Sequence, residues 1–488
     1  MSGTSYLDFV RFRAKANPCI SGFYEHLQGE SHAASKIVYL DYPHNEPSQF
    51  EPTPVAAVED DLSHVVNGIT PYTTRFLFVE NINSMVISKL GESLDIDPIF
   101  FADYIHSRGE HLPKAVSPPS LATLPSLIAT RSHIHLHHYQ FVSLKITGGR
   151  FSTSQMFKTD SNVPRNVRLL APISGTQLAR VRACCSFMIK TVNSSRICLF
   201  LVDPPINSVK ILETTSNKSY EALVLHGGFE DFQSPPLFSS FIHGKISRSV
   251  NKSSILDCII RYLQTQPPPG FLSRSPSILS VGYYPIRIVL AEWNFYTHLI
   301  CRMQYSIRNK RRLCDEDIVD LQRWRRRSKK NQQRLDTLAE VIIYHMDHED
   351  DKEPWMDILK DTNWLRAQLQ DYCQSFEQIV TVSTSLVQLL DSRQSILEAV
   401  NMRRLTYIAL VFMPLAWVAS LFSMSDAYSP GHELFWVYFA TSLPLLAIVL
   451  LLSALPYDQI RRALRHASER RGRIEDIRKM SRLPLGAV

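Results

Sequence analysis

Residues Leu405–Met424 read LTYIALVFMPLAWVASLFSM, a run of twenty residues without one charged side chain. A second uncharged run, Phe435–Leu455, reads FWVYFATSLPLLAIVLLLSAL and begins after a loop of ten residues. At about 1.5 Å per residue, a helix over either run is about 30 Å long, which matches the hydrocarbon core of a bilayer. Each run contains one proline, Pro414 or Pro444, which membrane helices tolerate. Because two such runs lie so close together, they predict a membrane hairpin rather than a buried helix pair of a soluble protein.

Positive charge lies at both sequence ends of this hairpin and is absent from the loop that connects its two runs. The flanking arginines are Arg393, Arg403 and Arg404 before the first run and Arg461, Arg462 and Arg465 after the second. The connecting loop contains Asp426 and Glu433 but no Lys or Arg. Since positively charged flanks stay in the cytoplasm, both termini are predicted to be cytoplasmic. The tail Tyr457–Val488 has nine Lys or Arg against four Asp or Glu, and its amphipathic basic segment Arg461–Arg482 is expected to face the lipid headgroups rather than to form a ligand site.

The composition of the whole chain is that of a globular protein. Of its 488 residues, 45% are hydrophobic and 20% are charged, which excludes collagen-like, low-complexity and wholly disordered classes. The eight cysteines form no C-x-x-C pair, so a reduced, intracellular compartment is expected for most of the chain. The motifs G-x-x-x-x-G-K-[ST], G-x-G-x-x-G, G-x-S-x-G and H-E-x-x-H do not occur, and we predict no enzyme.

A long amphipathic segment leads into the first run. From Asp357 to Arg404 there is no Pro or Gly, and apolar residues recur mostly three, four or seven positions apart. They are Ile358, Leu365, Leu369, Tyr372, Phe376, Ile379, Leu386, Leu389, Leu390, Ile396, Leu397 and Val400. Nothing stops a helix before the membrane, so Asp357–Met424 is expected to form one helix of about 100 Å. Such a helix cannot bury its stripe alone and implies antiparallel helices, neighbouring subunits or both.

The first run carries a stripe of small, hydroxylated or Met side chains spaced four and three apart. Its members are Met402, Thr406, Ala409, Met413, Ala416, Ser420 and Ser423. A face of this kind marks either tight helix packing or a water-lined pathway, and the pattern leaves both open. The second run has no comparable face. If an oligomer forms a pore, the first run therefore lines it.

Several segments resemble the CorA-like divalent cation (magnesium) transporter family, in particular its fungal branch. They are Leu90–Ile105 (LGESLDIDPIFFADYI), Ile134–His138, Asn162–Arg168 (NVPRNVR), Leu201–Pro205 (LVDPP), Ala291–Tyr296 (AEWNFY), Leu321–Arg327 (LQRWRRR) and Ser385–Ala399 (SLVQLLDSRQSILEA). The last, followed by Arg404–Ser425, is the most specific. The resemblance implies an α+β membrane protein with a cytosolic α/β domain, a long stalk helix and a two-helix C-terminal transmembrane hairpin. The expected boundaries are 1–285 for the cytosolic domain, 286–404 for the stalk, 405–455 for the hairpin (405–424 and 435–455) and 456–488 for the tail.

The resemblance also implies a function. It implies a channel for divalent metal cations, Mg²⁺ in particular, formed by a homo-oligomer (a pentamer) in the lipid bilayer. The expected pore-lining residues are Met402, Thr406, Ala409, Met413, Ala416 and Ser420. The cation is the transported ion, and no cofactor is expected.

The expected pore mouth departs from the family pattern. The family ends its first span with Gly-Met-Asn, and the matching residues here are Ser423, Met424 and Ser425, followed by Asp426. The change removes an amide oxygen that could face the water shell of the ion, and a ring of Asp426 side chains could attract cations. The alternative hypothesis is a non-conducting, membrane-tethered scaffold or sensor that keeps the same fold.

An acidic cluster precedes the long helix. It contains Asp347, Glu349, Asp350 and Asp351, and hard cations prefer such carboxylate oxygens. The resemblance suggests a regulatory divalent-metal site here. The interpretation that we favour is a solvated turn that places negative charge at a helix start.

Two further patterns are open to a binding interpretation. His133, His135 and His137 alternate on a predicted strand, Ser132–Phe141, and could chelate a transition metal with a third ligand. No partner residue is evident, so a strand with a half-wet histidine face is favoured. Between Arg302 and Arg334 twelve Lys or Arg face four Asp or Glu, which fits anionic lipid or a neighbouring acidic cluster better than nucleic acid. No nucleic-acid partner is expected.

Overall fold

The structure is a computed structural model of the chain. It describes residues 5–29, 33–44, 52–105, 124–127, 131–145, 156–170, 176–211, 219–225, 238–242, 254–308, 315–349, 351–423 and 434–454. The chain divides into a first unit, Met1–Thr381, and a second unit, Val382–Val488. Helix α10 (Glu353–Phe422) begins in the first unit and continues into the second.

The first unit is built on one mixed sheet. Its strands are β1 (Lys36–Pro43), β2 (Val55–Ala57), β3 (Thr73–Glu80), β4 (His133–Leu144), β5 (Met156–Thr159), β6 (Asn166–Leu169), β7 (Gln177–Val192), β8 (Ser195–Val202), β9 (Ser208–Ile211) and β10 (Ser219–Leu225). Their order is β2-β1-β3-β8-β7-β4-β10-β9-β5-β6. Strand β3 runs parallel to β8, and the other described pairings are antiparallel.

One end of the sheet closes on itself. Strand β6 pairs with β7 as well as with β5, so β7, β4, β10, β9, β5 and β6 form a small barrel. Apolar side chains such as Val142, Phe157, Val167, Val181 and Val209 form one buried cluster from these strands. Because side chains alternate between the two faces of a strand, the polar residues between them point away from this cluster.

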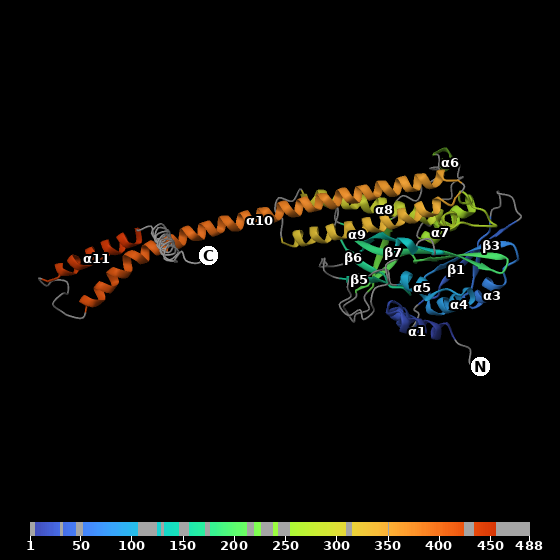
Figure 1. Cartoon of the computed structure of the whole chain (residues 1–488), viewed down its shortest axis with the longest axis horizontal. Helices are drawn as coiled ribbons and strands as arrows, with labels where there is room; N and C mark the ends of the chain where they lie inside the picture. Colours follow the sequence, from blue (N-terminus) through green and yellow to red (C-terminus); the bar gives the residue numbers. More distant parts are fainter. Residues whose placement is uncertain are drawn as a thin grey trace, which may run out of the picture. The chain divides into compact units, whose positions relative to one another are not determined.

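Two layers of helices cover the open part of the sheet, one on each face (Figure 1). One layer contains α1 (Tyr6–Ala16), α2 (Ser21–Gln28), α3 (Leu62–Asn67), α4 (Ser84–Leu94) and α5 (Pro98–Ile105). The other contains α7 (Ile255–Thr265), α8 (Ile278–Arg308), α9 (Asp315–Met346) and the first part of α10. Shorter helices are α6 (Phe238–Ile242), η1 (Pro18–Ile20), η2 (Glu59–Asp61) and η3 (Pro125–Leu127).

The central strand β3 shows why the sequence takes this form. Its segment TTRFLFVE is buried at every position, since helices cover both faces of the sheet. Phe76 and Phe78 face the α7–α10 side, and Leu77 and Val79 face the α1–α5 side. The Phe78 ring stacks on Phe200 with ring centroids 4.6 Å apart. Alternation along one strand therefore builds two separate cores.

The first part of α10 packs on this domain through its apolar stripe. Ile358, Leu365, Leu369 and Phe376 are at most 2% exposed and belong to the core that includes α8 and α9. The predicted uninterrupted helix is confirmed, and it begins at Glu353 and ends at Phe422. Asp351 accepts a hydrogen bond from the Glu353 N–H, at 3.2 Å, and so caps the start of the helix.

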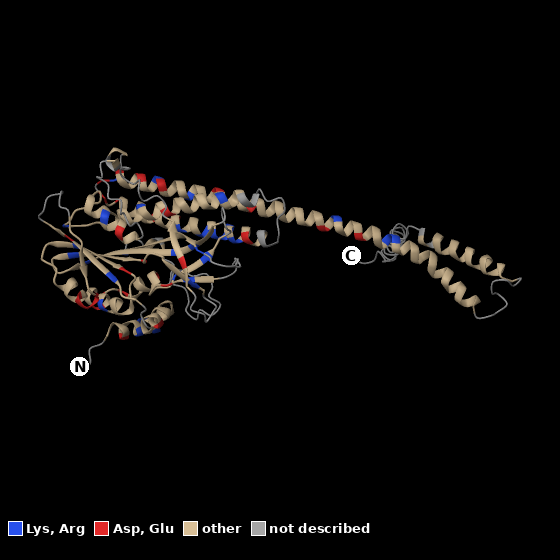
Figure 2. Ribbon diagram, turned by 180° about the vertical axis from the view of Figure 1, so that it is seen from behind, with Lys and Arg blue, Asp and Glu red and all other residues tan. Residues whose placement is uncertain are grey.

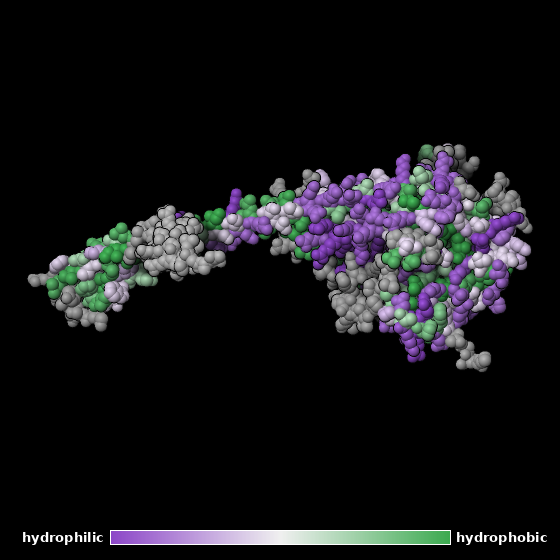
Figure 3. Space-filling model, viewed as in Figure 1, coloured by the Kyte–Doolittle hydropathy of each residue, from purple (hydrophilic) through white to green (hydrophobic). Residues whose placement is uncertain are grey.

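The second unit contains the predicted apolar hairpin. It consists of the last part of α10 and of α11 (Trp436–Ala454), and Figure 3 shows hydrophobic side chains over both helices. Val418 and Ser442 are buried, and Phe422 meets Tyr438 edge to face. Among the described residues, α10 is long and apolar enough to cross a membrane, with a mean hydropathy of 2.0 in its best window. The apolar part of α11, Trp436–Leu451, is shorter.

Candidate functional sites

The predicted pore stripe lies on an exposed face of α10. Met402, Thr406, Ala409, Met413, Ala416 and Ser420 are all exposed in the single chain. Met402 is 63% exposed and Met413 is 71% exposed. The Thr406 hydroxyl donates to the Met402 carbonyl at 2.8 Å, which leaves its oxygen lone pairs available to accept hydrogen bonds. The stripe therefore has no partner side chain among the described residues of the hairpin that would bury it.

Helix α11 covers a different side of α10. Its contact side includes the buried Val418 and the half-buried Pro414, Leu415 and Phe422. At 3.6 residues per turn, Met413 lies about 140° around the helix from Val418. The stripe is thus on the side of α10 that faces away from α11, and packing within the hairpin does not account for it. Figure 2 shows the ribbons of both hairpin helices without the colours of Lys, Arg, Asp or Glu.

The predicted pore mouth is described only at its first residue. Ser423 is exposed, and its N–H donates to the Ala419 carbonyl at 2.9 Å, which continues the last turn of α10. Met424, Ser425 and Asp426 lie outside the described residues.

The acidic cluster occupies the turn between α9 and α10. Asp347 pairs with Lys352 at 3.4 Å, and Asp351 caps α10 as described above. Glu349 extends to within 3.8 Å of where a Cβ on Gly270 would lie, and Asp350 lies outside the described residues. In the part of the chain that the structure describes, no group of three or more His, Cys, Asp or Glu could hold a metal ion. Asp347 and Asp351 already have local partners, which is what a solvated, helix-capping turn requires.

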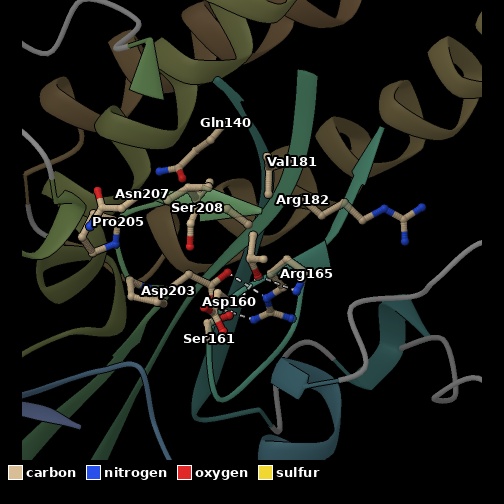
Figure 4. Close-up of a pocket in the computed structure, with 14 residues that line it drawn as sticks. Gln140, Asp160, Ser161, Arg165, Val181, Arg182, Asp203, Pro205, Asn207 and Ser208 are labelled. Carbon is tan, nitrogen blue, oxygen red and sulfur yellow. Dashed lines mark hydrogen bonds and ion pairs between the residues drawn. The ribbon is translucent and has the colours of Figure 1, made fainter. Parts of the chain in front are cut away.

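A polar pocket lies at one end of the barrel (Figure 4). Its cavity is about 190 Å³ in volume. The lining includes Gln140 of β4, Ser161 and Arg165 of the β5–β6 turn, Arg182 of β7, and Asp203 after β8. The segments NVPRNVR and LVDPP, which are far apart in sequence, meet here.

Arg165 and Asp203 form a buried ion pair beside this pocket. Arg165 Nε and Nη2 donate to the two carboxylate oxygens of Asp203 at 2.8 and 2.7 Å. The same carboxylate accepts from the Tyr104 hydroxyl at 2.7 Å and from the Cys184 N–H at 2.8 Å. Burial alone would lower the pKa of the Arg165 guanidinium, but Asp203 outweighs this effect and raises it. Burial, reinforced by Asp203, raises the pKa of Tyr104 far above its usual range.

This geometry gives Asp203 a structural task. Both of its oxygens are already engaged by an arginine, so it is not available as a metal ligand. The pair joins the end of β8 to α5 and to the β5–β6 turn. Sequence reasoning noted both segments but could not find their pairing, because Arg165 and Asp203 come together only when the barrel closes. The available signal was weak: Arg165 and Asp203 each lie beside a proline, and Asp203 directly follows the apolar run of β8.

The histidines of β4 are more enclosed than a half-wet strand face. Their residues are half-buried, but the Phe100 ring lies 5.4 Å from His133 and 5.2 Å from His135. Burial lowers the pKa of His133 to about 4 and that of His135 well below its ordinary value. Strand β7 places Ser186 beside His135, with Oγ 2.6 Å from Nδ1, and places Cys184 opposite His137. Burial raises the pKa of the Cys184 thiol to about 12, so this neighbour is a neutral thiol.

Comparison with known proteins then identifies the C-terminal region. Residues 310–462 match the family model described as CorA-like Mg²⁺ transporter protein. The predicted family resemblance is confirmed. The matched residues include α9, α10 and α11, which lie within the predicted stalk (286–404) and hairpin (405–455). The fungal branch stays a prediction.

Among solved structures, the chain is similar to the CorA magnesium transporter from Methanocaldococcus jannaschii. The identity is 10%, the similarity covers 87% of this chain and 98% of that one, and the TM-score is 0.36. A search of curated proteins finds no match. At that TM-score the family assignment rests on residues 310–462 alone. The matched residues follow the mixed α/β domain and include α10, which is long and apolar enough to cross a membrane.

Proposed function

We propose that this protein transports divalent metal cations, with Mg²⁺ as its physiological ion. The observation that carries the proposal is the match of residues 310–462, which includes the whole of α10 and α11, to a magnesium transporter family. The proposed assembly is a homo-oligomer, a pentamer by family resemblance, in which α10 of each subunit faces a central pore. Both termini are proposed to be cytoplasmic and the 425–434 loop to face outside.

The stripe on α10 supports the position of the pore. Helix α11 covers the opposite side, so the small and polar side chains are left for neighbouring copies of α10 or for water. The stripe holds no charge, and Thr406 and Ser420 offer hydroxyl groups. Because Mg²⁺ dehydrates reluctantly, such a face suits an ion that keeps its water shell, with hydroxyl groups accepting or donating hydrogen bonds to that shell. Met402 and Met413 are proposed to form apolar constrictions between them.

The outer mouth and the gate complete the proposal. Ser423, Met424, Ser425 and Asp426 are proposed to form the mouth, where a ring of Asp426 carboxylates would raise the local cation concentration. A regulatory divalent site at Asp347, Glu349, Asp350 and Asp351 stays a prediction. It requires ligands from outside the described residues or from another subunit, since Asp347 and Asp351 have local partners.

The test is metal uptake by vesicles that contain the purified full-length protein. Mg²⁺, Ni²⁺, Co²⁺ and Zn²⁺ are offered in turn, and a dye inside the vesicles reports entry. We expect Mg²⁺ uptake above that of empty vesicles. Ala416→Trp, which fills the proposed pore face, should abolish most of this uptake. Ile408→Trp, which places a tryptophan on a different face of the same helix, should leave most of it intact.

The second candidate function is a membrane-tethered scaffold or sensor without conduction. The observation that favours it is the Ser423-Met424-Ser425 sequence in place of Gly-Met-Asn. If none of the four ions enters above the empty-vesicle level, transport by the native chain is refuted. The double variant Ser423→Gly with Ser425→Asn then tests the scaffold hypothesis. If the native protein transports no ion and the double variant does, the native chain is a scaffold that keeps the fold of a transporter.

A further inference from the structure

The polar pocket at the end of the barrel contains one buried side chain whose hydrogen-bonding groups are unused. Gln140 of β4 lines the pocket and is 6% exposed. Among the described residues, its side-chain amide has no hydrogen-bond partner. An amide has one acceptor oxygen and two donor hydrogens, and leaving them unpaired away from bulk water costs free energy. The pocket is therefore the place where a partner for Gln140 is expected.

Gln140 occupies a position where the barrel otherwise has apolar side chains. In the strand register it lies directly opposite Val181 of β7, which belongs to the apolar cluster of the barrel. Two residues further along β4, on the same face of the strand, Val142 belongs to the same cluster. A leucine here would extend the cluster and leave no polar group unpaired, so the stability of the fold does not explain the glutamine. A core position that departs from its surroundings in this way is typical of a binding site.

The charged side chains of the lining are engaged within the protein. The Asp203 carboxylate accepts four hydrogen bonds, two of them from Arg165. Arg165 Nη1 donates to two backbone carbonyls of α5, and Asp160 pairs with Lys210 at 2.8 Å. Figure 4 shows the Arg182 guanidinium extending away from the Arg165–Asp203 pair. Because these charges are balanced by neighbours in the fold, the lining favours an uncharged ligand over an ion.

Two further neutral groups come from the segment that leads into β9. Asn207 and Ser208 line the pocket, and their side chains have no hydrogen-bond partner among the described residues. In Figure 4 the Gln140 side chain points toward Asn207 and Ser208. Together these three side chains offer both donors and acceptors of hydrogen bonds and carry no charge. A ligand that matches them needs donors and acceptors of its own.

The size of the pocket restricts the ligand further. Its volume of about 190 Å³ exceeds the roughly 150 Å³ of a protein cavity that holds benzene and is below the roughly 300 Å³ at which sites for drug-sized molecules begin. We propose that the pocket binds a small uncharged molecule, about the size of a six-membered ring, that carries a carboxamide or another adjacent N–H and C=O. Such a group can form two parallel hydrogen bonds with the Gln140 amide, because each partner presents a donor beside an acceptor. This inference is independent of the proposed transport function.

The experiment measures the binding of two probes, nicotinamide and uracil, to the full-length protein in detergent micelles by isothermal titration calorimetry. Both probes are uncharged single rings with an N–H beside a C=O. Nicotinate, in which a carboxylate replaces the carboxamide, is the matched control ligand. We expect at least one probe to bind saturably at one site per chain, and nicotinate to bind at least about tenfold more weakly than nicotinamide. A crystal grown with the bound probe should show its N–H and C=O within hydrogen-bond distance of the Gln140 amide.

Gln140→Leu removes the amide, and the loss of two hydrogen bonds should raise the dissociation constant of the probe about tenfold or more. Gln333→Leu is the matched control, because Gln333 is exposed on α9 and does not line the pocket, and it should keep the wild-type value. If Gln140→Leu does not fold, Ser208→Ala, which should weaken binding about threefold, and the position of the probe in the crystal still decide the matter. The proposal is overturned if neither probe binds saturably, if nicotinate binds as tightly as nicotinamide, if Gln140→Leu binds like the control, or if the pocket holds only water at saturating probe.

Discussion

Helix α10 presents the same apolar periodicity to two different surroundings. In the first unit, Ile358 and Leu369 are 0% exposed, because α8, α9 and the sheet cover them. In the second unit, Leu390 is 62% and Leu397 is 65% exposed on the same helix. The sequence pattern does not differ between the two parts. Burial within a single chain therefore separates a stripe that stabilises the domain from one that stays exposed.

The difference also extends to polar groups. In the first unit, buried polar side chains such as Asp203 and Arg75 have partners that come from distant strands. In the hairpin, Thr406 and Thr441 bond to backbone carbonyls of their own helix. Substituting a side chain of the first unit that is paired with a distant strand should lower the free energy of unfolding of that unit. Substituting a side chain of the hairpin that bonds only to its own helix should mainly change the association of subunits.

The largest expected effect tests the buried ion pair of the first unit. Asp203→Asn leaves the Arg165 guanidinium without a charge partner, and breaking a buried pair in this way should lower the free energy of unfolding by about 3 to 5 kcal/mol. Urea unfolding of the full-length protein, followed by tryptophan fluorescence, measures the change. Glu221→Gln removes one partner of the exposed Lys145–Glu221 pair and should cost less than about 1 kcal/mol. Equal losses in the two variants would contradict the structural task assigned to Asp203.

The next effect compares the two parts of α10 directly. Leu369→Ala creates a cavity in the core and should destabilise the first unit by about 3 kcal/mol in urea unfolding. Leu389→Ala removes the same atoms from a residue that is 50% exposed, and should change the unfolding of the first unit by less than about 0.5 kcal/mol. Leu389→Ala should instead lower the oligomeric fraction of the protein, which light scattering measures. A cost for Leu389→Ala that matches Leu369→Ala would mean that the exposed stripe is buried within its own subunit.

The smallest of the three effects concerns pH and is confined to the first unit. Burial lowers the pKa of His133 and of His138 to about 4, so both are neutral in the folded protein at pH 6.5, where the unfolded chain begins to bind protons. Above that pH they contribute nothing. Between pH 6.5 and about 4 the unfolded state gains protons that the folded state does not, and stability falls. For His138, which is 1% exposed, the loss should approach about 2 to 3 kcal/mol near pH 4.

His138→Asn tests this dependence, since the amide can occupy the position of Nδ1 beside the Leu136 carbonyl. The free energy of unfolding of this variant should decline less steeply between pH 6.5 and 4 than that of the wild type. An unchanged slope would show that His138 does not contribute. The unfolding of the hairpin, which has no histidine among residues 434–454, should show no such dependence.

Much of the membrane region could be predicted because its physical signals are local. The absence of charge over twenty residues and an unbroken helical period identify α10 and α11 without knowledge of any distant contact. The same reasoning identified β4 and the stripe from Met402 to Ser423. It did not find the barrel, whose closure depends on β6 pairing with β7, nor the partner of Arg165. Each of these requires residues that are separated in sequence and that meet only in the folded sheet.

By itself, the sequence determined the two apolar runs, the long helix that enters the first of them, and the match of residues 310–462 to a family model. The tertiary structure alone decided which side of α10 is left open, because α11 covers the side that contains Val418. It alone joined Arg165 to Asp203. Helical period and hydropathy are properties of neighbouring residues, whereas burial and charge pairing depend on how distant strands and helices pack.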